Sequence, residues 1–304
     1  VDPAYSSLEP VTPKKNIAYL TALILGGMIP IGFIYLLDLL NSKVTDKSDV
    51  SNVIDAAFLG DIPHTRKKKT LVKQVDYSPL AEAFRMVRTN IDFMLAGLPS
   101  EKAKVIFVTS TTSQEGKSHT AINLASSLSY SNKKVLIVET DIRMPKANAY
   151  LKMKMKELGL TDFIGNPKLK IGDVLTSHES NLNLHLISSG TVPPNTAELL
   201  MSDRMGILFE QVSEMYDYII VDTAAVGLVT DTLLISKYAD MFVYVVRAGY
   251  LDKSQLNVAQ TMYEQKRLPN MAILLNDMKS KKGYGYGYGN NPNHKKKWWK
   301  FAKS

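Results

Sequence analysis

One long apolar run lies near the beginning of the chain. Residues Ile17 to Leu37 form 21 consecutive positions without a charged side chain. About 20 apolar residues are enough for a helix to cross the hydrocarbon core of a bilayer, so the pattern predicts a transmembrane helix over residues 17–37. A signal peptide is disfavoured because no small-residue cleavage site follows, and the length disfavours a buried core helix.

From Pro79 onward, short apolar runs alternate with helical stretches. Six runs rich in β-branched residues predict strands at Lys104–Ser110, Val135–Glu139, Leu184–Ser189, Tyr218–Asp222, Met241–Val246 and Met271–Asn276. Strands that are apolar throughout and separated by helices indicate a parallel sheet covered on both faces. The predicted fold class is therefore α/β, a doubly wound and mainly parallel sheet preceded by one transmembrane helix.

Composition and charge exclude several classes of protein. With 304 residues, 45% of them hydrophobic and none of them cysteine, the chain is neither disordered throughout nor a disulfide scaffold, and it has no thiolate zinc site or cysteine nucleophile. The 37 basic and 29 acidic residues give a net charge of +8, and residues 279–304 alone hold eight lysines and no acid. Because the excess positive charge lies in one tail, no nucleic-acid partner is expected.

A phosphate-binding loop is predicted directly after the first strand of the sheet. Thr111 to Ser118 fit the P-loop (Walker A) pattern, which ends in Gly-Lys-Ser at the start of an amphipathic helix. Its backbone N–H groups would cradle phosphates, Lys117 would reach the terminal phosphates and Ser118 would hold magnesium. The alternative is a lysine that begins a helix by chance. The predicted nucleotide-binding residues are Thr112, Ser113, Gln114, Glu115, Gly116, Lys117, Ser118 and His119.

Acidic residues end two other predicted strands. Asp222 follows four apolar residues, as a Walker B aspartate would, and is a candidate magnesium ligand. Glu139 and Asp141, at the end of the second strand, lie two residues apart and so point to the same side. A single aspartate at a strand end can simply cap the next helix. Several at the carboxyl edge of one sheet, where open α/β folds bind ligands, favour a site instead.

These motifs resemble the bacterial tyrosine kinases, or BY-kinases, of the polysaccharide co-polymerase and capsular-exopolysaccharide family. The segment SPLAEAFRMVRTNIDF carries the family's E-x-x-R-x-x-R motif at Glu82, Arg85 and Arg88, and a D-x-R-x-P motif begins at Asp141. The segments SSGTVPPNTAELL and VGLVTD and a terminal tyrosine cluster follow in family order. The apolar run resembles the second transmembrane helix of the co-polymerase component.

The resemblance implies an ATP-dependent protein-tyrosine autokinase that uses Mg²⁺ and regulates the chain length and export of an extracellular or capsular polysaccharide. It also implies three sets of residues. The implied catalytic groups are Lys117, Asp141 and Glu139, with Ser118 and Asp222 at the metal; the implied autophosphorylation sites are Tyr284, Tyr286 and Tyr288; the implied oligomerisation residues are Glu82, Arg85 and Arg88. Implied partners are further copies in a ring, the polysaccharide polymerisation and export machinery, a tyrosine phosphatase and the bacterial inner membrane.

The resemblance also implies an order of segments along the chain. We expect a periplasmic segment at residues 1–16, the transmembrane helix at 17–37, a cytoplasmic linker at 38–78, the kinase domain at 79–282 and a tyrosine-rich, basic tail at 283–304. A first span and a periplasmic domain are expected upstream of Val1. The motif KKKWWKF at Lys295–Phe301 would contact the inner leaflet of the membrane, or else belong to a soluble tail.

Three positions depart from the family pattern. Gln114 stands where the loop usually has glycine, Glu139 where the first acid is usually aspartate, and Ala224-Ala225 where the family commonly has Pro-Pro. They favour one alternative, a catalytically weakened co-polymerase scaffold. A second alternative, a MinD- or ParA-like ATPase switch, shares the sheet and the loop but lacks the E-x-x-R-x-x-R helix and the tyrosine tail.

Overall fold

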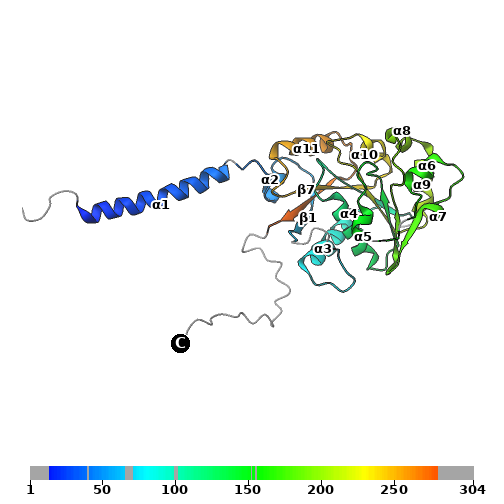
Figure 1. Ribbon diagram of the computed structural model, residues 1–304, viewed down its shortest axis with the longest axis horizontal. Helices are drawn as coiled ribbons and strands as arrows, with labels where there is room; N and C mark the ends of the chain where they lie inside the picture. The colour runs from blue at the N-terminus through cyan, green and yellow to red at the C-terminus, as the bar shows by residue number, and fades with distance from the viewer. Residues whose placement is uncertain are drawn as a thin grey trace, which may run out of the picture. The chain divides into compact units, whose positions relative to one another are not determined.

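The computed structural model describes residues 14–39, 41–65, 71–98, 102–151, 153–154 and 156–279. They fall into two units, Val1–Ser42 and Lys43–Ser304. The first unit contains the helix α1 (Lys15–Leu39), which is long and apolar enough to cross a membrane over Lys15–Leu36 (Figure 1). Pro30 lies inside this helix, where a proline is better tolerated in a transmembrane helix than in a soluble one.

The second unit is built on an eight-stranded sheet with the order β1-β8-β7-β2-β6-β3-β5-β4. Every neighbouring pair is parallel except β4 and β5, which are antiparallel. The strands are β1 (Ala57–Pro63), β2 (Lys104–Ser110), β3 (Val135–Glu139), β4 (Leu175–His178), β5 (Asn181–Ile187), β6 (Tyr218–Asp222), β7 (Met241–Arg247) and β8 (Ala272–Met278). The six predicted strands are all present, β5 being displaced toward the N-terminus from the predicted 184–189.

Helices cover both faces of this sheet (Figure 1). They are α2 (Lys47–Ser51), α3 (Pro79–Met94), α4 (Lys117–Ser129), α5 (Ala147–Leu151), α6 (Leu160–Gly165), α7 (Ile171–Val174), α8 (Thr196–Leu200), α9 (Asp203–Ser213), α10 (Asp231–Leu234) and α11 (Leu256–Glu264), with 3₁₀ turns at Ser236–Tyr238 and Lys253–Gln255. The doubly wound α/β class predicted from the sequence is therefore confirmed.

Strand alternation explains why the core has two halves. Ile106 and Val108 of β2 belong to one buried cluster, which also includes residues of α3 and α4. Phe107, between them, belongs to the other cluster, together with residues of α9 and α11. Successive side chains of a strand point to opposite faces, so a strand that is apolar throughout needs helices on both sides.

The segment predicted as a linker contributes to the folded unit. β1 lies within residues 38–78 and pairs in parallel with β8, and Leu59 and Ile62 of this strand are buried. Upstream of it, Val44 and Ile54 are also buried in the core. The linker prediction therefore does not hold for residues 43–63. Only a short apolar piece marks this strand in the sequence, and its stability depends on pairing with residues more than two hundred positions away.

The order of the central strands brings three loops to one edge. β2 pairs with β6, and β6 pairs with β3. The register places Asp222 opposite both Val108 and Glu139. The loops that follow these parallel strands therefore emerge side by side.

Candidate functional site

The loop after β2 has the geometry of a phosphate-binding loop. Gly116 has φ +101° and stands directly before α4, which begins at Lys117. Its backbone angle requires glycine at this position, and a Cβ there would lie 2.1 Å from Nδ2 of Asn276 and displace that side chain. The first N–H groups of a helix lack partners within the helix and favour an anion. The loop can therefore bind phosphate at the start of α4.

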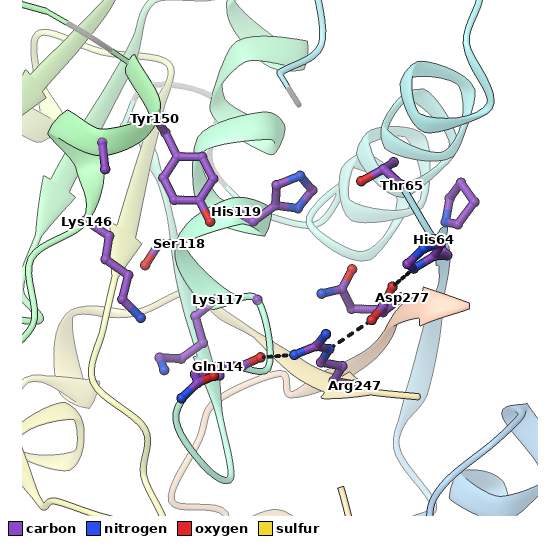
Figure 2. Close-up of a pocket in the computed structure, with 14 residues that line it drawn as sticks. His64, Thr65, Gln114, Lys117, Ser118, His119, Lys146, Tyr150, Arg247 and Asp277 are labelled. Carbon is purple, nitrogen blue, oxygen red and sulfur yellow. Dashed lines mark hydrogen bonds and ion pairs between the residues drawn. The ribbon is translucent and has the colours of Figure 1, made fainter. Parts of the chain in front are cut away.

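Lys117 is the first residue of α4 and directly follows Gly116 of the loop. Its side chain is buried, and burial lowers its pKa, while the carboxylates of Asp222 and Asp141 act in the opposite direction. Figure 2 shows Lys117 and Ser118 at the start of α4, beside the cavity. The ammonium group of Lys117 therefore lies close to the carboxylates of Asp222 and Asp141.

Asp222 is a buried carboxylate without a hydrogen-bond partner of good geometry on either oxygen. It is 1% exposed, and burial raises its pKa to about 7, against the lowering effect of the Ser118 hydroxyl and Lys117. An orphaned carboxylate beside a hydroxyl matches the hard oxygen ligands that Mg²⁺ prefers. Ser118 and Asp222 therefore fit the predicted metal ion.

No group of three or more His, Cys, Asp or Glu residues that could hold a metal occurs within the described ranges. A magnesium ion at Ser118 and Asp222 would accordingly take its other ligands from phosphate oxygens and water, as it does in other P-loop proteins.

Glu139, which ends β3, and Asp141, which follows it, have different surroundings. Oδ1 of Asp141 accepts the Met144 N–H at 3.2 Å, and burial raises the pKa of Asp141 in spite of Lys117. Glu139 is bound entirely by main-chain amides: Oε1 accepts from Lys146 (2.6 Å) and Ala147 (2.7 Å), and Oε2 accepts from the Ser189 N–H (3.3 Å). Asp141 thus retains capacity toward Lys117, whereas Glu139 fastens the end of β3 to neighbouring backbone.

A cavity of about 490 Å³ lies over the loop (Figure 2). It is lined by the predicted residues Gln114, Gly116, Lys117, Ser118 and His119, and by residues that sequence reasoning missed: Pro63, His64, Thr65, Lys146, Ala149, Tyr150, Arg247, Asn276 and Asp277. The predicted residues Thr112, Ser113 and Glu115 are not among its lining residues. Pro63 and Arg247 end β1 and β7, Asn276 and Asp277 lie near the end of β8, and His64 and Thr65 follow β1, so a position at a strand end is the signal that could have found several of them.

Glu115 supports the loop from inside. Its side chain is fully buried, with Oε1 accepting the Thr112 N–H at 2.6 Å and Oε2 accepting the Arg247 N–H at 3.2 Å. Burial raises its pKa to about 7. The side chain of Glu115 is therefore structural.

The structure shows the backbone surroundings of Gln114 and Ala224, two of the positions that depart from the family pattern. Gln114 has φ +65°, a left-handed conformation that glycine adopts without strain. The carbonyl of Ala224 accepts the hydroxyls of Thr109 (2.9 Å) and Thr232 (2.8 Å), which fix the loop after β6.

The predicted oligomerisation residues lie on α3 and contact their own chain. Arg85 pairs with Glu82 and also donates to the carbonyl of Asp76, while Nη1 of Arg88 donates to the carbonyl of Ser127 at 3.0 Å. All three side chains are partly exposed. Their role in self-association stays a prediction.

The predicted phosphorylation sites Tyr284, Tyr286 and Tyr288, and the motif Lys295–Phe301, lie outside the described residues.

Comparison with known proteins agrees with the geometry. The family model described as an AAA domain matches residues 103–268. The chain is 30% identical over 299 residues to the tyrosine-protein kinase ptk of Acinetobacter johnsonii, covering 93% of this chain but only 40% of that protein's length. It is 33% identical over 214 residues to the tyrosine-protein kinase CpsD of Streptococcus pneumoniae, covering 70% of this chain and 88% of that protein.

A solved structure is also similar. The kinase domain of the Escherichia coli tyrosine kinase ETK matches with a TM-score of 0.67 and 26% identity, over 81% of this chain and 100% of that one. With its P-loop, its strand-end carboxylates and these relatives, the chain belongs to the bacterial tyrosine kinase (BY-kinase) family, linked to capsule and exopolysaccharide systems.

Proposed function

We propose that this chain is an ATP-dependent protein-tyrosine autokinase that regulates the chain length and export of an extracellular or capsular polysaccharide. The observation that carries the proposal is the buried carboxylate of Asp222, which has no hydrogen-bond partner of good geometry. It lies beside Lys117 and Ser118, the first two residues of α4, whose N-terminal amides favour a phosphate. The names of the relatives add the tyrosine specificity. Acceptors in this proposal are Tyr284, Tyr286 and Tyr288.

The mechanism follows from charge placement. Phosphoryl transfer depends mainly on positioning and on neutralising charge, so Lys117 and the amides at the start of α4 would hold the phosphates. Ser118 and Asp222 would hold Mg²⁺, which supplies further positive charge when bound. Asp141 would accept the proton of the attacking tyrosine hydroxyl, whose pKa near 10 otherwise keeps it protonated at neutral pH. Burial raises the pKa of Asp141, in the direction that a general base needs.

A nucleotide-binding scaffold is the second candidate, and the contacts of Glu139 favour it. In the kinase proposal Glu139 would assist at the water shell of the metal ion. Both of its oxygens are instead engaged by backbone amides. In the scaffold, the chain would bind ATP and support the co-polymerase by oligomerising, without phosphoryl transfer.

The proposal also includes the location of the chain in the cell and its partners. α1 would anchor the chain in the bacterial inner membrane, with the P-loop domain on the cytoplasmic side, where ATP is available. Further copies in a ring, the polysaccharide polymerisation and export machinery, and a tyrosine phosphatase would be its partners. Nucleic acid is not proposed as a partner, because the charge excess lies in residues 279–304.

Autophosphorylation of the full chain tests the proposal. The detergent-solubilised protein is incubated with radiolabelled ATP and Mg²⁺ and blotted for phosphotyrosine, beside Lys117→Met and a variant with Tyr284, Tyr286 and Tyr288 changed to phenylalanine. The kinase is expected to label itself, and both variants are expected to lose most of the label. Nucleotide binding without label in the wild type would establish the scaffold instead. Label chiefly at other tyrosines would refute the proposed acceptors.

A further inference from the structure

Three side chains form a row on the wall of the cavity, opposite the start of α4 (Figure 2). Nδ1 of His64 lies 2.5 Å from Oδ1 of Asp277, and Nε of Arg247 donates to Oδ2 of the same carboxylate at 2.9 Å. Nη1 of Arg247 then donates to the main-chain carbonyl of Gln114 at 3.0 Å. His64 follows β1, Asp277 lies near the end of β8 and Arg247 ends β7. Side chains from the ends of three parallel strands thus form a series of contacts that ends at the main-chain carbonyl of Gln114 in the phosphate loop.

That peptide bond needs support. Gln114 has φ +65°, a strained conformation for a residue with a side chain, and such strain persists only where the surroundings hold it. Neighbouring contacts strengthen the same region: Nδ2 of Asn276 donates to the carbonyl of Glu115 at 2.8 Å, and Oε2 of Glu115 accepts the N–H of Arg247 at 3.2 Å. Two consecutive carbonyls of the loop are therefore held by side chains from β7 and β8.

Holding a carbonyl also sets the direction of an N–H group. A peptide bond is planar and trans, so its C=O and N–H point in opposite directions. With the Gln114 carbonyl held by Arg247, the N–H of Glu115 points away from Arg247. If this peptide turned over, the loop would present a carbonyl oxygen to the phosphates, and the negative end of that dipole would repel them.

We propose that Arg247 is a positioning residue for nucleotide binding, which keeps the peptide between Gln114 and Glu115 in its phosphate-binding orientation. Asp277 holds the guanidinium in place, and His64 holds Asp277. Arginine suits this role because its planar fork offers several donors in fixed directions, which a lysine ammonium does not. The inference rests on the nucleotide binding in the proposed function, and it adds to the site a residue outside every motif of the sequence.

Nucleotide affinity of the full chain in detergent tests this role without any need for kinase activity. Dissociation constants for a fluorescent ATP analogue and the matching ADP analogue, each with Mg²⁺, are measured by titration. Arg247→Met is expected to weaken both by about tenfold or more, the usual effect of losing a charged hydrogen bond. Arg247→Lys and Asp277→Asn are expected to weaken them less. Arg204→Met is the matched control, because Arg204 also donates to carbonyls, those of Phe163 and Leu169, outside the cavity.

A second substitution separates positioning from direct contact with the nucleotide. Glycine adopts a positive φ without support, so Gln114→Gly is expected to restore most of the affinity that Arg247→Met removes. A double variant as weak as Arg247→Met would show that the guanidinium touches the nucleotide and would overturn the positioning role. Wild-type affinity in Arg247→Met would overturn it as well. If Arg247→Met does not fold by circular dichroism, Arg247→Lys with and without Gln114→Gly decides the question. If the wild-type chain binds nucleotide but does not label itself, the kinase proposal is refuted and the role of Arg247 in nucleotide binding is unaffected.

Discussion

The guanidinium of Arg143 lies 3.0 Å from the carboxylate of Asp231, and this pair joins the loop after β3 to the first residue of α10. The two side chains differ in exposure, at 53% for Arg143 and 6% for Asp231. The pair lies beside Asp141, since the pKa of Asp141 is sensitive to Asp231. It therefore fixes two of the three loops that surround the site.

Removing Arg143 should leave a buried carboxylate without its cation. We expect Arg143→Ala to lower the free energy of unfolding by about 1–2 kcal/mol, within the usual range for an unsatisfied buried group. The double variant Arg143→Ala with Asp231→Asn should lose less than the sum of the two single variants. Urea denaturation at neutral pH measures all three, and strict additivity would show that the pair contributes no coupling.

Asp222 should make stability depend on pH. Its pKa is raised from 3.8 to about 7, so between about pH 4 and pH 7 the native chain keeps a proton that the unfolded chain has released. The free energy of unfolding should therefore fall as the pH rises through this window. Glu115, whose burial raises its pKa from 4.5 to about 7, acts in the same direction.

Asp222→Asn should remove the share of this pH dependence that Asp222 contributes. At about pH 8 without Mg²⁺, we expect the variant to be more stable than the wild type by on the order of 1–3 kcal/mol. Urea denaturation at about pH 5 and pH 8 tests this, and parallel pH profiles for the two proteins would contradict it. Mg²⁺ with nucleotide should raise the melting temperature of the wild type more than that of the variant.

Gly116 should not tolerate a methyl group. In Gly116→Ala the new Cβ would stand 2.1 Å from Nδ2 of Asn276, at a φ of +101°. We expect a loss of stability of about 1–3 kcal/mol and a loss of measurable nucleotide binding. Gly172→Ala is the matched control, because Gly172 lies in α7 with nothing within 4 Å of the added Cβ. That variant should keep its affinity and its stability; equal losses in both would remove the special role of Gly116.

The arginines of α3 should affect assembly and stability to different degrees. Arg88 donates to the carbonyl of Ser127 near the end of α4, so Arg88→Ala should cost about 1 kcal/mol of stability within a single copy. Arg85→Ala with Arg88→Ala should also reduce the oligomer size measured by light scattering in detergent. An unchanged size, with melting curves that show a folded chain, would mean that these residues act only within one copy.

Sequence reasoning located the parts of this fold that short apolar runs and one loop motif define. Lys117 and Ser118 could be placed because their Gly-Lys-Ser motif ends the loop after an apolar strand, and Asp222 because it ends another; parallel strands bring such ends together. β1 was missed because its burial depends on pairing with β8. Arg247 and Asn276 were missed for a related reason: their partners in the loop, Gln114 and Glu115, lie 133 and 161 residues away in the sequence.

The two edge strands of the sheet, β1 and β4, influence how readily copies of the protein can aggregate. β1 has register shifts between Phe58 and Gly60 and between Asp61 and Pro63, and β4 has only four residues, with an irregularity between Ser177 and His178. Long, regular, unprotected edges invite strands of other molecules, whereas short or bulged edges and prolines discourage them. Neither border of this sheet offers a regular ladder for another molecule. Copies crowded at high local density should therefore resist amyloid-like stacking, and any ordered contact between them should involve helices and loops.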